Sequence, residues 1–352
     1  MSSHNATPQW FDAHLDLAYL AECGRNMTAE LRPEMQPHPP AGITLPAMRQ
    51  AHVTMCLGTI FTEAHPAGQT AKYPTVGYTA NDPDAAHNAG KAQLARYHAW
   101  RYAGFIELMP RRGEQTASTA APLRIGILME CADPIREPSE LAWWADQGVI
   151  TIGMAWAMGS RYAAGNARPA IDGSAGLTAI GRELVQEMDR LNIVHDLSHL
   201  SQRATEDLLE LTDAPVIASH SNCRALIDGK NERHLTDDTI REIGRRGGII
   251  GLNLCSPFLI PAELDVARAH VDMARAHIEH ICTIHGTTNH VGLGSDIDGG
   301  FSTEKLPDGI NSVFDLHVLA DELRKAKWTE DAINGFQHAN WTRFWSEQNH
   351  SS

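Results

Sequence analysis

Short apolar runs alternate with helical patterns along this chain of 352 residues. Eight such runs cover residues 11–16, 53–61, 123–130, 148–156, 193–199, 215–220, 248–254 and 290–296. Helical patterns follow at residues 85–108, 139–147, 177–191, 203–211, 236–246, 266–285, 314–326 and 330–337. Strands that alternate with helices predict βαβ units and a parallel sheet, and eight of them favour closure into an α/β fold of the (β/α)8 TIM-barrel type.

A single barrel with insertions can reach this length, so we expect one domain over residues 1–352. The polar, Gly- and Pro-bearing stretches 62–86 and 157–174 predict long loops after strands, and the Pro-rich segment 33–45 predicts another loop. An open doubly wound sheet is the alternative architecture. It is disfavoured because no G-x-G-x-x-G motif follows the first run, and because polar residues end several runs instead of meeting at one crevice.

The composition is acidic, with 29 Lys and Arg against 43 Asp and Glu and a formal net charge of -14. This charge, without a basic stripe, argues against nucleic acid or an anionic membrane as a partner. No apolar run approaches the roughly 18 residues of a membrane span, and no secretory signal pattern is visible at the N-terminus. The six cysteines are scattered without a C-x-x-C pair, which is typical of reduced thiols, so we expect a cytoplasmic protein.

Two consecutive runs end in a histidine, His199 in I-V-H-D-L-S-H and His220 in P-V-I-A-S-H-S-N. Imidazoles at the carboxyl ends of successive parallel strands are how a barrel builds a metal site. The first run adds His14 and Asp16, which lie two residues apart and therefore point to the same face of a strand. The chain contains 19 histidines, which makes a metal site worth seeking.

Polar residues at the ends of the runs are expected to collect at one rim of the barrel, where the active sites of such barrels lie. The set is His14, Asp16, Glu130, His199, His220 and Asp296. Nitrogen and carboxylate ligands without a thiolate suit Zn²⁺, although Mn²⁺, Fe²⁺ and Co²⁺ also accept them, and Glu130 has two oxygens with which to bridge two metals. A water shared by two metals can become a nucleophile near neutral pH, and Asp296 could pass its proton to a leaving amine. Asp298, by contrast, is expected to cap its loop.

Several motifs together resemble the renal (membrane) dipeptidase family of zinc peptidases, within the amidohydrolase group. They are F-D-A-H-L-D, the M-E that ends the third run, H-D-L-S-H-L-S, V-I-A-S-H-S-N, R-H-L-T-D-D, L-G-S-D-I-D-G and H-A-N-W-T-R. They stand in the family's order from about residue 10 to residue 346. The resemblance implies a barrel with two zinc ions that hydrolyses dipeptides, often with a D-residue at the C-terminal position, and it suggests a homodimer.

The resemblance also implies roles for single residues. His14 and Asp16 would bind the first zinc, Glu130 would bridge both ions, and His199 and His220 would bind the second. Asp296 would transfer protons, and Arg233 would bind the free C-terminal carboxylate of the substrate. A guanidinium binds a carboxylate bidentately, although spacing alone would indicate that Arg233 is an exposed loop charge.

The chain departs from the family pattern at the end of the fourth run, which reads T-I-G-M-A-W-A-M-G-S-R-Y. Family members of the mammalian type have a histidine there that hydrogen-bonds to the scissile carbonyl, whereas this chain has Trp156 at or beside that position. Trp156 is either a core aromatic that closes the barrel end or part of a changed substrate pocket, in which Arg161 would be another candidate donor. His195 is expected to be buried and hydrogen-bonded, facing the barrel interior below the metals.

We therefore expect a zinc-dependent dipeptidase that uses a metal-bridging hydroxide, with two zinc ions per chain. One alternative is an amidohydrolase acting on another small amide, an N-acyl amino acid or a lactone, in which Arg233 could lack a substrate carboxylate. A second alternative is a metal-binding barrel without catalysis, used as a sensor or scaffold. The full ligand set together with Asp296 favours an enzyme.

Overall fold

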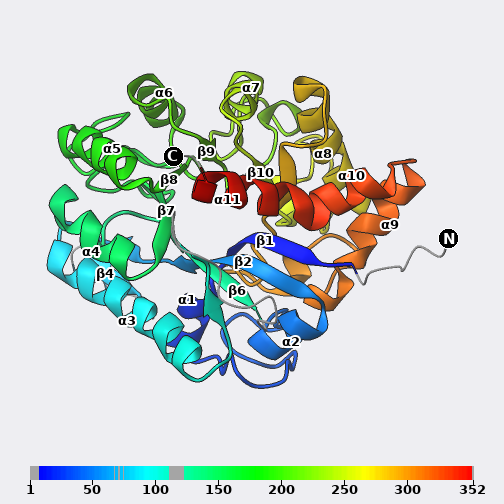
Figure 1. The fold of residues 1–352 in the computed structure, drawn as a ribbon, viewed down its shortest axis with the longest axis horizontal. Coiled ribbons are helices and arrows are strands. Elements are labelled where there is room, and N and C mark those ends of the chain that lie inside the picture. The colour runs from blue at the N-terminus through cyan, green and yellow to red at the C-terminus, as the bar shows by residue number, and fades with distance from the viewer. Residues whose placement is uncertain (1–7, 67, 70–71, 74, 111–122, 351–352) are drawn as a thin grey trace.

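The computed structural model describes residues 8–66, 68–69, 72–73, 75–110 and 123–350 (Figure 1). Its strands are β1 (Trp10–Leu15), β2 (Val53–Ile60), β3 (Glu63–His65), β4 (Gly77–Thr79), β5 (Glu107–Leu108), β6 (Arg124–Met129), β7 (Val149–Gly153), β8 (Val194–Asp196), β9 (Val216–Ile217), β10 (Ile250–Leu252) and β11 (Val291–Leu293). Its α-helices are α1 (Leu17–Glu22), α2 (Leu45–Gln50), α3 (Pro83–Tyr102), α4 (Leu141–Asp146), α5 (Ala179–Leu191), α6 (Gln202–Leu211), α7 (Asp237–Arg245), α8 (Val271–His285), α9 (His317–Lys325), α10 (Glu330–Asn334) and α11 (Asn340–His350).

The strands form a nearly closed parallel barrel. In the described residues the hydrogen-bonded path runs β10-β11-β1-β2-β6-β7-β8-β9, and its pairings are parallel. A parallel bridge between Ala218 and Ile250 joins the two ends of this path, and the Gly251 N–H donates to the Ala218 oxygen at 2.8 Å. Helices surround the strands in Figure 1. The predicted (β/α)8 barrel is confirmed.

Side-chain caps decide where the outer helices begin. The hydroxyl oxygens of Thr178, Ser201 and Thr236 accept backbone N–H groups three residues later, which stabilises the first turns of α5, α6 and α7. Asn192 ends α5 in the left-handed conformation, with φ of 54°. Among the described helices, none combines the length and apolarity needed to cross a membrane.

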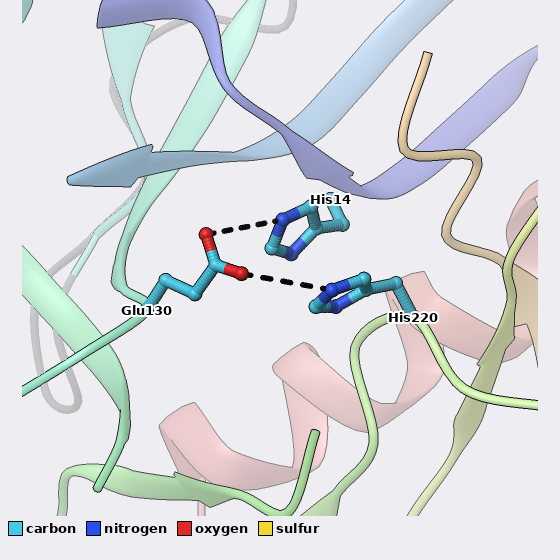
Figure 2. A group of neighbouring side chains, drawn as sticks. All are labelled: His14, Glu130 and His220. Carbon is cyan, nitrogen blue, oxygen red and sulfur yellow. Dashed lines mark ion pairs between the residues drawn. The ribbon is translucent and has the colours of Figure 1, made fainter. Parts of the chain in front are cut away.

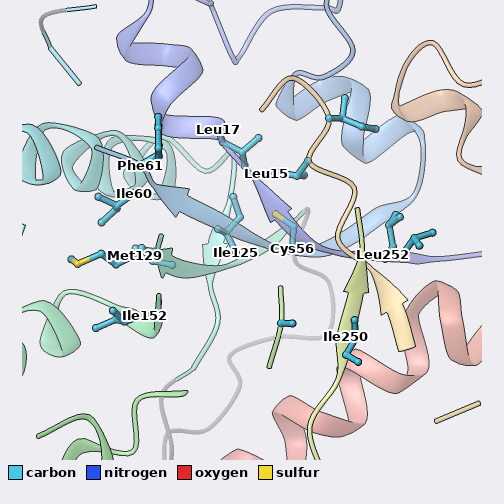
Figure 3. Packing of buried hydrophobic residues seen from close by; sticks show 14 of the residues in the cluster. Leu15, Leu17, Cys56, Ile60, Phe61, Ile125, Met129, Ile152, Ile250 and Leu252 are labelled. Carbon is cyan, nitrogen blue, oxygen red and sulfur yellow. The ribbon is translucent and has the colours of Figure 1, made fainter. Parts of the chain in front are cut away.

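Two hydrophobic cores hold the barrel together. The outer core lies between the strands and the helices and includes Leu15, Ile60, Met129, Ile152 and Leu252 (Figure 3). The inner core fills the barrel and joins α11 to the strands; it consists of Phe11, Ala13, Leu57, Met109, Leu128, Ile150, Val194, Ile217, Ile249, Trp341, Phe344 and Trp345. Trp345 of α11 lies beside Val149 and Val194, the first residues of β7 and β8, so α11 covers the amino-terminal end of the barrel. The carboxyl-terminal end is left for a site.

The structure corrects several predicted boundaries on the amino-terminal side. Residues 62–86 are not loop throughout, because β3 and β4 pair there in a separate parallel sheet and α3 begins at Pro83. Residues 67, 70–71 and 74 of this stretch lie outside the described residues. The Pro-rich loop ends where α2 begins, α1 was not predicted, and α3 ends at Tyr102, before the short strand β5.

Other boundaries differ in the second half. The strands there are shorter than the apolar runs, because the last residues of each run bend away from the ladder and carry polar side chains into the barrel mouth. The predicted helix 266–285 begins only at Val271, α9 begins at His317, and α10 ends at Asn334, with the unpredicted α11 beyond it. Residues 157–174 contain none of the described helices or strands, as expected for a long loop.

Candidate functional site

A register shift in β1 determines the direction in which the side chains of His14 and Asp16 point. The pairing of β1 with β2 is irregular between Asp12 and Leu15. Ala13 packs in the inner core and Leu15 in the outer core, although a regular strand would place both on one face. The irregularity therefore reverses the alternation, so that His14 and Asp16 point into the barrel mouth together. Strand irregularities next to active sites commonly re-aim side chains in this way.

Three imidazoles converge on one carboxylate at the carboxyl-terminal end of the barrel. Glu130 Oε2 lies 3.6 Å from His14 Nε2, and Glu130 Oε1 lies 3.3 Å from His199 Nε2 and 3.7 Å from His220 Nε2. Figure 2 shows His14, Glu130 and His220 reaching toward one another from three separate segments. Asp16 Oδ1 lies 3.8 Å from His14 Nε2.

These atoms fit divalent metal ions. In the described residues, two groups have ligand atoms within 4.8 Å of one another, one formed by His14, Glu130 and His220 and the other by His14, Asp16 and Asp296. His14 Nε2 and Glu130 Oε2 are buried and have no hydrogen-bond partner among the described residues. Buried polar atoms normally have partners, so atoms of the types that bind Zn²⁺ or Mn²⁺ indicate a cation here. His199 joins the same centre through Glu130.

The electrostatics of the site also favour cations. Burial raises the pKa values of Asp16, Glu130 and Asp296 above the usual carboxyl range, and the charge of Glu130 raises the pKa of Asp16 further. Burial lowers the pKa values of His199 and His220 well below the usual histidine range, which keeps both rings neutral. Neutral imidazoles beside crowded carboxylates are the state in which such groups bind metal.

Several supporting residues were not predicted. The Thr59 hydroxyl donates to Asp16 Oδ1, Asn253 Nδ2 donates to Asp296 Oδ2 at 3.0 Å, and Asn166 Oδ1 lies 3.2 Å from His199 Nδ1. Ser219 Oγ contacts the Nδ1 atoms of His14 and His220, on the side of each ring away from Glu130. Asn253 lies within the seventh apolar run and directly follows β10, so extending the strand-end rule to amides would have found it. Thr59, within its run, gives no such signal.

A cavity of about 380 Å³ opens above the cluster. Asp16, Glu130, His199, His220 and Asp296 line its floor. Aromatic side chains supply much of the wall; they are Tyr19, Phe61, Tyr73, Trp156, Phe258 and Phe301.

Trp156 lines this cavity. Its ring lies edge-on to Phe61, with centroids 5.2 Å apart, and 6.0 Å from the ring of His199. Of the two interpretations left open by the sequence, the structure places Trp156 in the pocket wall. Arg161 does not reach the cavity, because its guanidinium donates to the Arg136 carbonyl oxygen at 2.8 Å.

Arg233 is buried beside the metal cluster. Its Nη2 donates to the His220 carbonyl oxygen at 2.7 Å, its Nη1 donates to Ser221 Oγ at 3.1 Å, and its guanidinium lies 5.2 Å from the centroid of Phe258. Its Nε–H has no partner among the described residues. Arg233 is therefore not an exposed loop charge, but it lies behind the cavity wall and does not line the cavity.

Two other residues have structural contacts. His195 is buried and hydrogen-bonded, as predicted, but its Nε2 lies 2.8 Å from Asp189 of α5 and the ring does not face the barrel interior. Val194 occupies the interior position instead. Asp298 has a structural role, as expected, but it does not cap its own loop: its side chain accepts the backbone N–H groups of Gly42 and Ile43 and pairs with Arg25.

Comparison with known proteins identifies the family. The profile of the membrane dipeptidases, peptidase family M19, matches residues 5–352. An uncharacterized dipeptidase of Schizosaccharomyces pombe is 36% identical over 176 residues, which are 49% of this chain and 40% of that protein. Human Dipeptidase 3 is 32% identical over 169 residues, which are 48% of this chain and 33% of that protein. The aligned segments thus span less than half of these relatives.

The fold comparison extends over the whole barrel. A crystal structure of a metallopeptidase from Rhodobacter sphaeroides, liganded with a phosphinate mimic of the dipeptide L-Ala-D-Ala, superposes with a TM-score of 0.81 at 25% identity. That superposition covers 97% of this chain and 100% of the other. Together with the family profile, it shows that this chain belongs to the membrane dipeptidase family, peptidase family M19.

Proposed function

We propose that this protein is a metal-dependent dipeptidase with two zinc ions per chain. The observation that carries the proposal is the convergence of three histidine Nε2 atoms on Glu130, with Asp16 and Asp296 beside them, at the floor of the cavity. Family membership supports it, as does the dipeptide mimic bound by the Rhodobacter sphaeroides protein.

His14 and Asp16 would hold one ion, His199 and His220 the other, and Glu130 would bridge them. When bound, two divalent ions lower the pKa of water and stabilise negative charge on a carbonyl oxygen. Asp296 is held by the Asn253 amide at 3.0 Å and lines the cavity floor, where it would take a proton from the attacking water and return it to the leaving amine. The aromatic wall would exclude water from the reacting groups.

Arg233 would bind the substrate carboxylate after a shift of its side chain or of Phe258, which separates it from the cavity. The position of Arg233 behind the wall also favours a second candidate, an amidohydrolase acting on a small amide, N-acyl amino acid or lactone without a free carboxylate.

The test is metal analysis of the purified protein together with hydrolysis of matched L-Xaa-L-Xaa and L-Xaa-D-Xaa dipeptides and their C-terminal amides. About two zinc ions per chain and faster cleavage of the free dipeptides would support the dipeptidase. Cleavage of amides or lactones with no preference for a carboxylate would favour the second candidate. Failure to retain any metal after zinc reconstitution would overturn both.

We also propose a cytoplasmic location and a homodimer. Six cysteines without a disulfide suit a reducing compartment, and the dimer rests on resemblance to the family. Cell fractionation and light scattering on the purified protein would test them separately.

A further inference from the structure

One hydroxyl group contacts two of the site histidines. Ser219 Oγ lies 3.2 Å from His14 Nδ1 and 2.8 Å from His220 Nδ1, on the side of each ring away from Glu130. Ser219 follows β9 and His14 lies near the end of β1, so the contact joins segments 205 residues apart in the sequence. Ser219 is completely buried.

The Ser219 hydroxyl has a single proton, which it donates in a hydrogen bond to Asp196. Ser219 Oγ lies 2.5 Å from Asp196 Oδ2, a distance typical of a hydroxyl that donates to a carboxylate. Asp196 Oδ1 accepts the backbone N–H groups of Ser198 and Ser219, at 3.0 and 2.9 Å. Since a carboxylate with two such donors acts as an acceptor, the Ser219 proton lies between Oγ and Oδ2.

Ser219 Oγ can then only accept from the two rings. An oxygen that has given its proton away keeps two lone pairs, and the Nδ1 atoms of His14 and His220 are both within reach. Each ring must therefore have its proton on Nδ1, which leaves the Nε2 lone pair facing Glu130. Ser198 Oγ, 3.3 Å from Ser219 Oγ, is the more distant neighbour and does not alter this assignment.

We propose that Ser219 and Asp196 form a positioning pair that fixes His14 and His220 in the Nδ1–H tautomer, so that both present Nε2 to the metal centre. This inference rests on the proposed metal site but not on the substrate. Partners of this kind hold a metal-binding histidine in orientation and raise its basicity, and their loss usually weakens metal binding by about 10- to 100-fold.

The decisive variant is Asp196→Asn, which keeps the size of the side chain and reverses one hydrogen bond. The amide oxygen can still accept the two backbone N–H groups, but the amide nitrogen would donate to Ser219 Oγ. The Ser219 proton would then turn to a histidine Nδ1 and force that ring into the other tautomer. Ser219→Ala, which removes the hydroxyl, is the second variant.

Asp12 offers a matched control within the same barrel. Its Oδ1 accepts two backbone N–H groups and its Oδ2 accepts the Ser295 hydroxyl, which repeats the bonding of Asp196 and Ser219. Among the described residues, Ser295 Oγ has no bond to a histidine ring. Asp12→Asn therefore reports the cost of neutralising a buried carboxylate without a change of tautomer.

The measurement is ¹⁵N NMR of the metal-free full chain labelled at histidine, at alkaline pH, where imidazoles are neutral. The wild type should show protonated Nδ1 and unprotonated Nε2 for His14 and His220. Asp196→Asn should invert this for at least one ring, whereas Asp12→Asn should leave both unchanged. Wild-type rings protonated at Nε2, or rings indifferent to Asp196→Asn, would overturn the inference.

Metal affinity gives the second measurement, by competition of Zn²⁺ with a chelator. Asp196→Asn and Ser219→Ala should bind Zn²⁺ about 10- to 100-fold more weakly than Asp12→Asn. Equal affinity in all three would count against the pair. If the wild type binds zinc but cleaves no dipeptide, the proposed substrate fails while the pair stands; if it binds no zinc, the metal centre fails and the NMR result alone decides the tautomers.

Discussion

The Nε2 atoms of His199 and His220 lie 3.0 Å apart and face each other. The Nδ1 atom of His199 is directed at Asn166 Oδ1, and that of His220 at Ser219. An amide oxygen accepts only, so His199 has its proton on Nδ1 and a lone pair on Nε2. Two buried lone pairs at this distance repel each other unless a cation lies between or beside them.

Metal should therefore stabilise the folded protein. At a free zinc concentration a thousand times the Kd, the free energy of unfolding should rise by about 4 kcal/mol, because only the folded chain brings the ligands together. His199→Ala should remove about half of the bound metal and the part of this gain that the lost ion contributes. Denaturant unfolding with and without chelator measures it. His270 has an exposed ring, so His270→Ala should behave as the wild type. Unfolding curves that are the same with and without chelator would contradict the metal centre.

Replacement of Arg233 should affect substrates with a free carboxylate. Arg233→Ala should lower kcat/KM for a dipeptide by about 10- to 100-fold, mainly through KM, because a hydrogen bond to a charged group contributes about 1.5–3 kcal/mol. The C-terminal amide of the same dipeptide should lose much less. Arg161→Ala is the control, since that guanidinium bonds to Arg136 away from the cavity. An unchanged ratio between dipeptide and amide would exclude the carboxylate role.

Trp156 should set the size of side chain that the cavity accepts. Trp156→Ala opens the wall between Phe61 and His199, so substrates with large side chains should gain kcat/KM relative to those with alanine. The bound metal should stay constant. The control is Trp143→Ala, a half-exposed tryptophan on α4. A parallel change in kcat/KM for large and small substrates would show that Trp156 acts only on stability.

The buried ring of His277 should make the protein sensitive to acid. Burial lowers its pKa from 6.5 to about 4, and its Nδ1 accepts the Cys223 N–H at 3.0 Å. Between pH 6.5 and pH 4, His277 becomes protonated in the unfolded chain but stays neutral in the folded chain. The free energy of unfolding should therefore fall by about 3 kcal/mol between pH 6.5 and pH 4, and this contribution is fully present above pH 6.5.

His277→Asn should flatten this dependence. Asparagine keeps an acceptor for the Cys223 N–H and does not titrate, so its urea midpoint should change less between pH 6.5 and pH 4 than that of the wild type. His317→Asn, at an exposed position on α9, is the control and should keep the wild-type slope. Equal slopes in all three proteins would show that His277 is not the sensitive group.

Trp341 should be essential for closing the amino-terminal end of the barrel. Its ring stacks on Phe11 with centroids 5.6 Å apart, and its Nε1–H donates to the Leu293 oxygen at 3.1 Å. Trp341→Ala should lower the free energy of unfolding by about 3–5 kcal/mol, because it leaves a large cavity and removes the hydrogen bond to Leu293. Trp341→Phe should cost less. A loss below 1 kcal/mol in urea unfolding would show that α11 is dispensable.

The sequence by itself predicts the barrel and most of the residues at its metal centre. Alternating apolar runs and helical patterns specify parallel strands, and parallel strands bring their carboxyl ends to one rim. That rule places His14, Glu130, His220 and Asp296 together without knowledge of any contact. The chemistry of the set, imidazole and carboxylate without thiolate, then indicates the class of metal.

Only the tertiary structure decides how these side chains are aimed and supported. The register shift in β1 turns His14 into the mouth, and the outward direction of His195 breaks the alternation that the sequence suggested. Ser219 reaches His14 across 205 residues, and Trp341 reaches Phe11 from the other end of the chain. Such contacts depend on strand irregularities and on packing between distant segments, and neither leaves a periodic pattern in the sequence.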